Sequence, residues 1–389
     1  MLPGRTVFAE LIAHVSPRKF RTCVDRYHGD YKASRFSCWD QFLCMAFAQL
    51  TYRESLRDIE ACLRAVQPKL YHVGIRARVA RSTLAEANET RDWRIYADFA
   101  QDLITTARAL YLDESLGVDL ANTVYALDAT IIELCLSVFP WARYRRHDAA
   151  VKMHTQLDLR GMIPTIVHIT EGKCADVTFL DDLPLEAGAI YIMDRGYVDF
   201  ARLHRFTTEA AFFVTRTKRG IRFRRRVSHP VDFASGLFSD HIVGLATTSA
   251  RRDYPDALRR VHYVDPDTKK RLIFLTNNFT LPALTITRLY KARWQVELFF
   301  KWIKQHLRIK AFYGTSENAV KTQIWIALSM YVLVAIVRKR LALDVSLYKL
   351  LQILSITLFE KTPISIAVSD VGSKLDGVDN SKQLQLFDL

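Results

Sequence analysis

The sequence has none of the cysteine spacings that bind metals. Its six cysteines form no CxxC pair and no Cys/His arrangement at zinc-finger spacing. We therefore expect reduced thiols, most of them small core residues, as in cytosolic proteins. The first residues also lack the apolar stretch and small-residue cleavage site of a signal peptide, so we expect a cytoplasmic protein.

The usual motifs of nucleophilic and nucleotide-binding enzymes are missing too. There is no GxSxG elbow, no GxxxxGK[ST] loop and no HExxH pair. The chain has no internal repeat and no low-complexity block. These absences are compatible with a reaction that needs no side-chain nucleophile.

One hydrophobic run approaches the length of a membrane span. Residues 324–337 are fourteen mostly apolar residues that end at three consecutive cations, Arg338, Lys339 and Arg340. A spanning helix needs about 20 apolar residues. We therefore expect a buried core helix and no membrane association, with a membrane protein as a distant alternative.

Positive charge is in excess. The chain has 55 Lys and Arg against 41 Asp and Glu, which gives a formal charge of +14 and a pI near 9.5. Half of the residues are hydrophobic and 11% are aromatic, enough to build real cores, so disorder is not expected. An excess of this size favours a polyanionic partner, either nucleic acid or an anionic membrane surface.

Residues 1–112 have the pattern of helices. Apolar residues recur at helical spacing through residues 37–66, with a polar break at 51–54. In the next segment Thr83 and Glu86 have the spacing of a capping box, which predicts a helix start at that point.

Three arginines precede that expected helix: Arg76, Arg78 and Arg81. A short helix after a tight turn with a basic flank is typical of a helix-turn-helix module. An ordinary helical bundle with a solvated basic edge explains the same pattern, so both interpretations stay open.

From about residue 120 the pattern changes to that of strands. Residues 152–170 are predicted to form two strands joined by a tight turn at Arg160 and Gly161, and residues 210–218 a further strand. Residues 214–275 then form a β-rich segment with 14 Lys and Arg against 6 Asp, a net charge of +8. This segment is a candidate for gripping phosphates, although a solvated sheet face would carry the same charges.

A helix with a polar stripe is expected over residues 289–310. At 100° per residue, Tyr290, Arg293, Glu297 and Lys304 fall within a stripe about 60° wide. An apolar stripe lies beside it and consists of Leu289, Val296, Phe300, Ile303 and Leu307. Taken alone, the polar stripe is also explained by ordinary i,i+4 pairing of Arg293 with Glu297.

Three carboxylates stand out in these segments. Asp128 and Asp194 each follow an apolar run at the expected end of a strand, and Glu297 lies on the helix stripe. Ligands commonly gather where the strands of an α/β sheet give way to loops. Converging there, the three would make an all-oxygen site suited to Mg²⁺ or Mn²⁺. Singly, Asp128 could be a turn residue and Asp194 could pair with Arg195.

The run YKARWQVELFFKWIK fits the pattern Y-x2-R-x3-E-x6-K at Tyr290, Arg293, Glu297 and Lys304. It resembles the YREK signature of bacterial insertion-sequence transposases of the DDE type, in the large family named after insertion sequence four.

The two other acids support this resemblance. The segment YALDAT, with Asp128, and the segment IYIMDRGYVDF, with Asp194, resemble those that carry the first and second acids of the family, in the same order. The resemblance covers most of the chain, including the helical region at the N-terminus.

The resemblance implies an α/β fold with an RNase H-like catalytic core, interrupted by a β-rich insertion and preceded by an all-α N-terminal DNA-binding domain. The expected domains are residues 1–112 (helical, DNA-binding), 113–213 (first part of the core), 214–275 (insertion), 276–350 (second part of the core, with the YREK helix) and 351–389 (C-terminal region and polar tail).

The resemblance also implies the function of a DNA transposase. Asp128, Asp194 and Glu297 would be catalytic and would hold two Mg²⁺ ions per active site, with Mn²⁺ as an alternative. The partners would be double-stranded DNA, as terminal inverted repeats and as target, and a second copy of the chain in a homodimer on DNA. The protein would cut the element's ends, in some cases through a hairpin, and join them to the target in the bacterial cytoplasm, at the nucleoid.

Basic residues would hold the DNA near the cut. Three residues of the signature would contact phosphates there, namely Tyr290, Arg293 and Lys304. Arg145, Arg146 and Lys152 follow the strand of Asp128 and could contact DNA as well, although solvated charge explains them equally well.

The chain departs from the family in one respect. Better-characterised relatives hold a flipped base against a tryptophan of the insertion, and residues 214–275 contain no tryptophan. Phe223, Phe233, Phe238 or Tyr263 could stack on a base instead. Two other functions also stay open: a transposase-derived repressor that binds DNA without cutting it, and a metal-dependent nuclease that cuts without joining.

Overall fold

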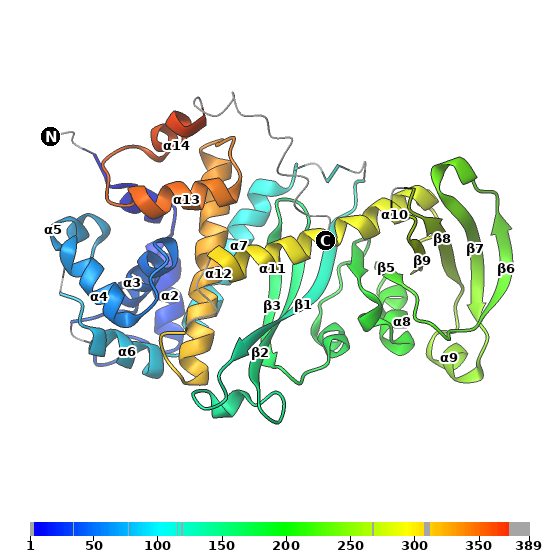
Figure 1. Ribbon diagram of the computed structural model, residues 1–389, viewed down its shortest axis with the longest axis horizontal. Helices are drawn as coiled ribbons and strands as arrows, with labels where there is room; N and C mark the ends of the chain where they lie inside the picture. The colour runs from blue at the N-terminus through cyan, green and yellow to red at the C-terminus, as the bar shows by residue number, and fades with distance from the viewer. Residues whose placement is uncertain are drawn as a thin grey trace. The chain divides into compact units, whose positions relative to one another are not determined.

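The computed structural model describes residues 4–33, 35–76, 78–114, 116–117, 120–266, 268–306 and 312–372. The chain forms two compact units, one of Met1–Leu110 with Trp302–Leu389 and one of Tyr111–Lys301 (Figure 1).

This division differs in one place from the domains expected from the sequence. The expected start of the catalytic core at residue 113 lies close to the division at Tyr111. The expected second part of the core, 276–350, spans both units, because the chain from Trp302 onward belongs to the first. Of the expected polar tail, residues 373–389 lie outside the described residues.

The first unit is helical, as predicted for residues 1–112. Its first helices are α1 (Val7–Ile12), α2 (Pro17–Arg26), α3 (Cys38–Leu50), α4 (Leu56–Ala65), α5 (Gln67–Leu70), the 3₁₀ turn η1 (Tyr71–Val73), α6 (Arg81–Thr90) and α7 (Arg94–Tyr111). The chain later adds the end of α11 (Trp294–His306), then α12 (Glu317–Arg340), α13 (Leu347–Thr357) and α14 (Ile364–Gly372).

Aromatic rings pack α2, α3 and α7 together. The ring of Phe99 on α7 meets Phe20 of α2 edge-on, with 5.0 Å between centroids, and Phe42 of α3 at 5.2 Å. Helix α3 begins where Ser37 and Asp40 form a reciprocal capping box, which satisfies N–H groups of the first turn. The polar break expected at 51–54 lies between α3 and α4.

The helix start predicted at Thr83 is wrong. Helix α6 begins two residues earlier, at Arg81, and Ala80 at its N-cap makes no side-chain hydrogen bond. Thr83 is therefore inside the helix, whereas a capping residue needs an extended backbone. Leu84 and Ala87 are buried and face the core whether the helix begins at Arg81 or at Thr83. The apolar pattern therefore did not determine where the helix begins.

The connection between α4 and α6 bears on the helix-turn-helix interpretation. The two helices contact each other. They are separated by residues 66–80, which include α5 and η1. A helix-turn-helix joins its helices by a turn of about three or four residues. This favours the helical-bundle interpretation, and DNA binding by the helices stays a prediction.

The buried core helix expected from the apolar run is confirmed as α12. It packs against α1, α3, α6 and α13. Among the described residues it is the one helix long and apolar enough to cross a membrane, with a mean hydropathy of 1.8 over 18 residues, and 94% of that window is buried within the fold. A helix that is apolar all round is as typical of a protein core as of a membrane span.

The second unit is built on one sheet (Figure 1). Its strands are β1 (Val124–Leu134), β2 (Ala149–Asp158), β3 (Ile163–Glu171), β4 (Ile190–Met193), β5 (Phe212–Arg216), β6 (Phe223–His229), β7 (Leu237–Leu245), β8 (Leu258–Val264) and β9 (Arg271–Thr276). Their order is β3-β2-β1-β4-β5-β9-β8-β7-β6. The β1–β4 and β4–β5 pairs are parallel and the others antiparallel.

Helical elements connect and flank these strands. They are η2 (Pro140–Ala142), η3 (Asp176–Asp182), η4 (Arg195–Tyr197), α8 (Phe200–Thr208), η5 (Phe233–Ser235), α9 (Thr248–Asp253) and α10 (Ala283–Ala292). Elements η3, η4 and α8 share a core with Leu127, Met193 and Leu275. On α10, Tyr290 packs at 4.9 Å from Phe274, the strand neighbour of Leu275. Since successive strand residues point to opposite faces, α10 covers the other face.

The hairpin predicted at Arg160 and Gly161 is confirmed between β2 and β3. Gly161 has a φ of +74°. A Cβ at this position would lie 2.2 Å from the ring of Tyr111. Both the backbone conformation and the close approach of this ring therefore require glycine.

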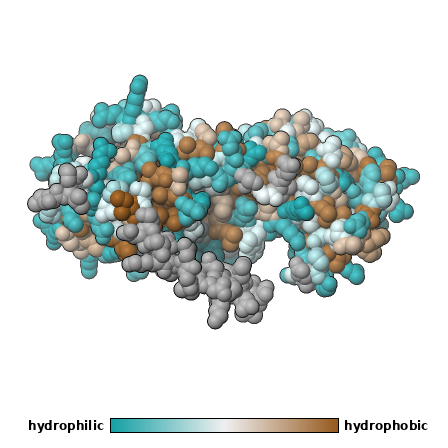
Figure 2. Space-filling model, turned by 90° about the horizontal axis from the view of Figure 1, so that it is seen from above, coloured by the Kyte–Doolittle hydropathy of each residue, from teal (hydrophilic) through white to brown (hydrophobic). Residues whose placement is uncertain are grey.

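The strands expected in residues 214–275 are present as β6, β7, β8 and β9, but the strand expected to reach residue 250 ends at Leu245 and is followed by helix α9. They extend the same sheet, because β9 pairs with β5. The outer strand β6 is exposed along nearly its whole length and carries Arg224, Arg225 and Arg226. Figure 2 shows hydrophobic residues exposed among hydrophilic ones at the end of the unit where these strands lie. In this part of the chain Phe233 of η5 and Phe238 of β7 are 70% and 57% exposed.

Candidate active site

Asp128 lies in the middle of a strand. We expected the strand to end at this residue, and that expectation is wrong, because β1 continues to Leu134. The residues after Asp128 alternate in burial and pair with β2 as far as Leu134. The backbone N–H of Ala129 donates to Asp128 Oδ1 at 2.8 Å. The carboxylate is thus fixed on a rigid strand.

The register of the parallel pair β1–β4 aligns the first two acids. Leu127 pairs with Met193, so Asp128 and Asp194 directly follow paired residues on neighbouring strands. Leu127 and Met193 both point into the core with α8, and the alternation of strand residues turns the two acids to the opposite face. As predicted, Asp194 lies just past a strand end, where its Oδ1 accepts from Gly196 N at 2.6 Å.

The helix expected over 289–310 is interrupted at Arg293. Helix α10 ends at Ala292 and α11 begins at Trp294. The N–H of Arg293 bonds to the carbonyl of Tyr290 at 3.2 Å, and the N–H of Val296 to that of Arg293 at 3.0 Å. These bonds span three residues in place of four, which tightens the helix at this point. Residues 307–310 of the expected helix lie outside the described residues.

Arg293 joins the helix acid to the strand acid. Its Nη1 donates to Asp128 Oδ2 at 3.1 Å and its Nη2 donates to Glu297 Oε1 at 2.5 Å. The side chain of Arg293 is 16% exposed. Its Nε is buried and has no acceptor among the described residues. The i,i+4 pair expected from the sequence is therefore present, and the same guanidinium also reaches a residue 165 positions away.

Burial and like charge raise the pKa of Asp128 to about 6. Desolvation is the largest cause. The hydrogen bond from Ala129 and the charge of Arg293 lower the pKa, while the charges of Asp194 and Glu297 raise it. The three acids thus act on one another, as a cluster of negative charge that attracts a cation should.

The donors at this site suit a hard divalent cation. Asp128, Asp194 and Glu297 offer only carboxylate oxygens, which Mg²⁺ and Mn²⁺ prefer. Among the described residues, no three His, Cys, Asp or Glu side chains lie close enough together to enclose an ion. Arg293 contacts two of the three acids, Asp128 and Glu297. The residues fit a divalent ion in chemistry, once the guanidinium moves.

The other residues of the signature lie along the same helices. Tyr290 on α10 is buried at 9% exposure, and the guanidinium of Arg293 lies over its ring at 5.8 Å. Burial raises the pKa of Tyr290, against the effects of Arg293 and Arg216. Lys304 is partly buried on α11, seven residues after Glu297, and belongs to the first unit.

The additional basic residues predicted to contact DNA fall into two groups. Arg145 and Arg146 are exposed in the loop before β2, where Arg145 lies over the ring of Tyr144 at 4.9 Å. Lys152 is 9% exposed; its Nζ donates to Cys174 O at 2.6 Å and pairs with Asp176 at 3.0 Å. A DNA contact by Lys152 would require it to leave these partners, and that role stays a prediction.

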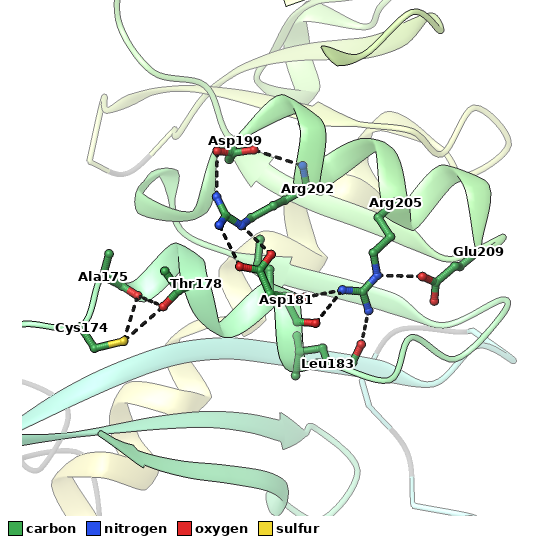
Figure 3. Close-up of polar contacts among 10 residues, drawn as sticks. Cys174, Ala175, Thr178, Asp181, Leu183, Asp199, Arg202, Arg205 and Glu209 are labelled. Atoms are coloured by element: carbon green, nitrogen blue, oxygen red, sulfur yellow. Dashed lines mark hydrogen bonds and ion pairs between the residues drawn. The ribbon is translucent and has the colours of Figure 1, made fainter. Parts of the chain in front are cut away.

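The partner of Lys152 belongs to a firmly held segment. Asp176 begins η3, which is tied to α8 by two arginines (Figure 3). Arg202 makes two 2.8 Å contacts with the carboxylate of Asp181. Arg205 donates to the carbonyls of Leu180, Asp181 and Leu183 and to Glu209. These contacts fix η3 against α8.

Two buried hydroxyls near the acids were not singled out by the sequence pattern. Thr155 pairs with Asp128 across β1 and β2, and its Oγ1 is buried without a partner among the described residues. Tyr197 is 1% exposed, and its hydroxyl also has no hydrogen-bond partner among the described residues. Burial is the largest cause that raises the pKa of Tyr197, and the charges of Asp128 and Asp194 raise it further. The position of Tyr197 in the D-R-G-Y segment was a usable signal, whereas no local pattern marked Thr155.

The aromatic side chains of the insertion differ in exposure. Phe233 and Phe238 are exposed and meet edge-on at 6.2 Å, and Phe238 lies 4.8 Å from His262. Tyr263 is buried, and Phe223 is partly buried under Arg260. Of the four aromatics considered for stacking, Phe233 and Phe238 are therefore the accessible ones.

Two protein families match the chain. Residues 120–333, more than half of the chain, match the transposase DDE domain. Residues 3–76 match a domain of unknown function, DUF4372. The first match contains Asp128, Asp194 and Glu297, and the second contains the first helices of the helical unit.

Proteins named as transposases are similar over long stretches. One is the transposase y4zB of Sinorhizobium fredii, 31% identical over 288 residues, which are 72% of this chain and 78% of the relative. Another is a transposase for insertion sequence element IS5377 of Geobacillus stearothermophilus, 31% identical over 53% of this chain and 54% of the relative. A third, for element IS4SA of Synechocystis, is 23% identical over 54% and 59%.

One solved structure is weakly similar. It is a piggyBac transposase synaptic complex with hairpin DNA, with a TM-score of 0.45 and 10% identity over 97% of this chain and 82% of that one. Similarity at this level does not define the fold of the present chain.

Proposed function

The chain belongs to the family of DDE-domain transposases, and on that premise we propose that it cuts DNA at the ends of an insertion sequence and joins those ends to target DNA. Asp128, Asp194 and Glu297 are the proposed catalytic residues. The observation that carries the proposal is the alignment of Asp128 with Asp194 on one sheet face, with Glu297 joined to Asp128 through Arg293.

The sheet topology supports an RNase H-like core as the catalytic part. An antiparallel β1–β2–β3 meander is followed by β4 and β5, each parallel to its neighbour on the β1 side. Strands β6 to β9 then form the insertion between the second acid and the third. Glu297 on α11 follows them, which matches the order of strand acid, strand acid and helix acid in the family.

The three acids would hold the divalent cofactor, which we propose to be two Mg²⁺ ions, or Mn²⁺ in their place. When bound, the ions would activate the attacking oxygen and stabilise the leaving oxygen of an in-line displacement at phosphorus. Asp128 extends from strand β1, and Asp194 lies at the end of β4 with its carboxylate held by Gly196 N. This chain would thus supply a fixed platform for the reaction.

Basic and aromatic side chains of the chain would position the DNA. Arg293 has a guanidinium suited to two-point contact with phosphate. Tyr290 would support the strand beside it and Lys304 would hold the backbone further along. Arg145 lies exposed in the loop before β2 and would contact the duplex from the sheet side.

Two other regions would contribute to DNA binding. The exposed arginines of β6 would grip phosphates through charge, since phosphate neutralisation dominates nonspecific affinity. Phe233 or Phe238 would offer a face for a base. The helical unit would help to read the terminal inverted repeats.

The assembly and location follow from the reaction. Because two ends of an element must be cut and joined together, we propose a homodimer on DNA, in the bacterial cytoplasm where the DNA lies. A hairpin intermediate, as in other members of the family, belongs to the same proposal.

A cleavage and joining assay tests the proposal. Purified full-length protein is incubated with Mg²⁺ and a fragment that carries the ends of its element, beside Glu297→Gln. Cutting at the ends and joining to a plasmid, with loss of both in the variant and retained DNA binding, would support a transposase that uses Glu297.

Two other outcomes identify the alternatives. Binding without cutting by the wild type would indicate a repressor. Cutting without joining would indicate a nuclease.

A further inference from the structure

Two acids of the site share a cation that belongs to the chain itself. One guanidinium lies between Asp128 Oδ2 and Glu297 Oε1, at 3.1 and 2.5 Å. A divalent ion held by the two acids would need carboxylate oxygens, and one oxygen of each acid is now taken up by Arg293. The other oxygen of Asp128 already accepts from Ala129 N. Arg293 and a divalent ion therefore compete for the same ligands.

The contacts of Arg293 are also incomplete for a buried arginine. Each carboxylate receives one contact from it, and its buried Nε has no acceptor among the described residues. A buried donor without an acceptor costs free energy, so this arrangement is poorer than a bidentate one. A DNA phosphate offers Arg293 the bidentate partner that it lacks.

We infer that Arg293 is the resident counter-ion of the carboxylate site. In the DNA-free protein its pairing with Asp128 and Glu297 keeps the affinity for divalent ions low. When DNA binds, Arg293 pairs with a phosphate instead, and the two carboxylates become free to bind an ion. The inference rests on the proposed metal-dependent function and adds a control to it. Cofactor loading is coupled to the arrival of DNA, and the free protein is protected from premature activation.

The first test measures Mn²⁺ binding to the full-length protein without DNA, by titration calorimetry. Arg293→Gln should bind Mn²⁺ about tenfold more tightly than the wild type, within the range usual for coupling between two sites. Arg216→Gln is the matched control, because Arg216 also acts on Tyr290, whereas the arginine that pairs with Asp128 and Glu297 is Arg293. Equal or weaker binding by Arg293→Gln, or an equal gain in the control, would overturn the inference.

The second test uses the wild type itself and does not depend on the folding of a variant. A short blunt DNA duplex should raise the Mn²⁺ affinity of the wild type by a similar factor, and should have little effect on Arg293→Gln. No gain from the duplex in the wild type would overturn the inference.

A third variant separates the inference from the function on which it rests. If Asp128→Asn abolishes Mn²⁺ binding while Arg293→Gln leaves it unchanged, the metal site stands and the role of Arg293 is wrong. If the wild type binds no Mn²⁺ with or without the duplex, both the inference and the proposed metal-dependent function fail.

Discussion

The two halves of the β-rich unit each bury an arginine–aspartate pair, and the pairs differ in how completely they are satisfied. In the insertion, Arg259 contacts both oxygens of Asp240 at 2.9 and 2.7 Å and donates its remaining nitrogen to the carbonyl of Leu281 at 2.5 Å. In the acid-bearing half, Arg293 makes one contact to Asp128 and one to Glu297, and its Nε has no acceptor among the described residues.

The difference indicates that the Arg259–Asp240 pair is structural, whereas Arg293 can exchange its carboxylate partners for another ligand. Every nitrogen of Arg259 is used, and both side chains of its pair are less than 10% exposed. Opening that pair would leave a charge without a partner in the interior. Asp128 is more accessible, at 21%, and its pKa is raised, so its ionised form is incompletely compensated. Residues that await a ligand are expected to show this kind of unmet interaction.

The largest expected effect is on catalysis. Asp128→Asn should lower the rate of DNA cleavage by about 10³-fold or more, because the proposed mechanism depends on an ionised carboxylate at this position. The rate is measured in single turnover with Mg²⁺ and DNA bearing the element's ends. Circular dichroism serves as the control for folding. Cleavage within about tenfold of the wild type would contradict the catalytic role of Asp128.

The matching change in the insertion should act on stability. Asp240→Asn should lower the free energy of unfolding by about 3–5 kcal/mol, because it leaves Arg259 buried with half of its partners. Urea denaturation at pH 8 measures this loss. A loss below about 1 kcal/mol would mean that the insertion tolerates an incompletely paired arginine, as the candidate site does with Arg293.

The pH dependence of stability should report the burial of Asp128. A raised carboxyl pKa means that Asp128 stabilises the fold fully below its unfolded pKa near 4 and that this stability is lost as the pH rises through about 6. Asp128→Asn should therefore be more stable than the wild type at pH 8, by up to about 3 kcal/mol, and nearly equal to it at pH 4.

This comparison is made by urea denaturation in the presence of EDTA. Divalent ions bound to the wild type would add stability and hide the effect. A variant less stable than the wild type at pH 8 would show that the pair with Arg293 outweighs the burial of Asp128.

The smallest expected effect concerns the exposed arginines of β6. Changing Arg224, Arg225 and Arg226 together to Gln should weaken DNA binding and reduce the slope of log affinity against log salt by about 1 for each lost phosphate contact. Fluorescence anisotropy at several salt concentrations measures the slope. An unchanged slope would mean that these arginines are a solvated edge, as first considered for this segment.

Much of the fold was predictable from local pattern. The helices of residues 1–112, the hairpin at Gly161 and the four insertion strands follow from apolar periodicity and turn chemistry, which act over a few residues. The failures occurred at boundaries. Thr83 and Asp128 were each placed at the end of an element, because a capping pattern or an acid is a weaker signal than the packing of the residues around it.

The candidate site was predictable as a set of residues, and less so as an arrangement. The spacing of Tyr290, Arg293 and Glu297 was sufficient to predict a common stripe. It contained no information that Arg293 would reach Asp128. Nor did the basic run before β2 indicate that Lys152 would face Asp176 in the interior while Arg145 stayed exposed.

The sequence by itself determined the chemistry of this protein: three carboxylates in order, a helix stripe of fixed spacing, and a surplus of arginine in one segment. The tertiary structure alone decided which of these groups meet. The register of β1 with β4 brings Asp128 beside Asp194, and the tight turn at Arg293 directs one guanidinium to two acids. These pairings depend on contacts between residues far apart in the chain, which local sequence patterns do not specify.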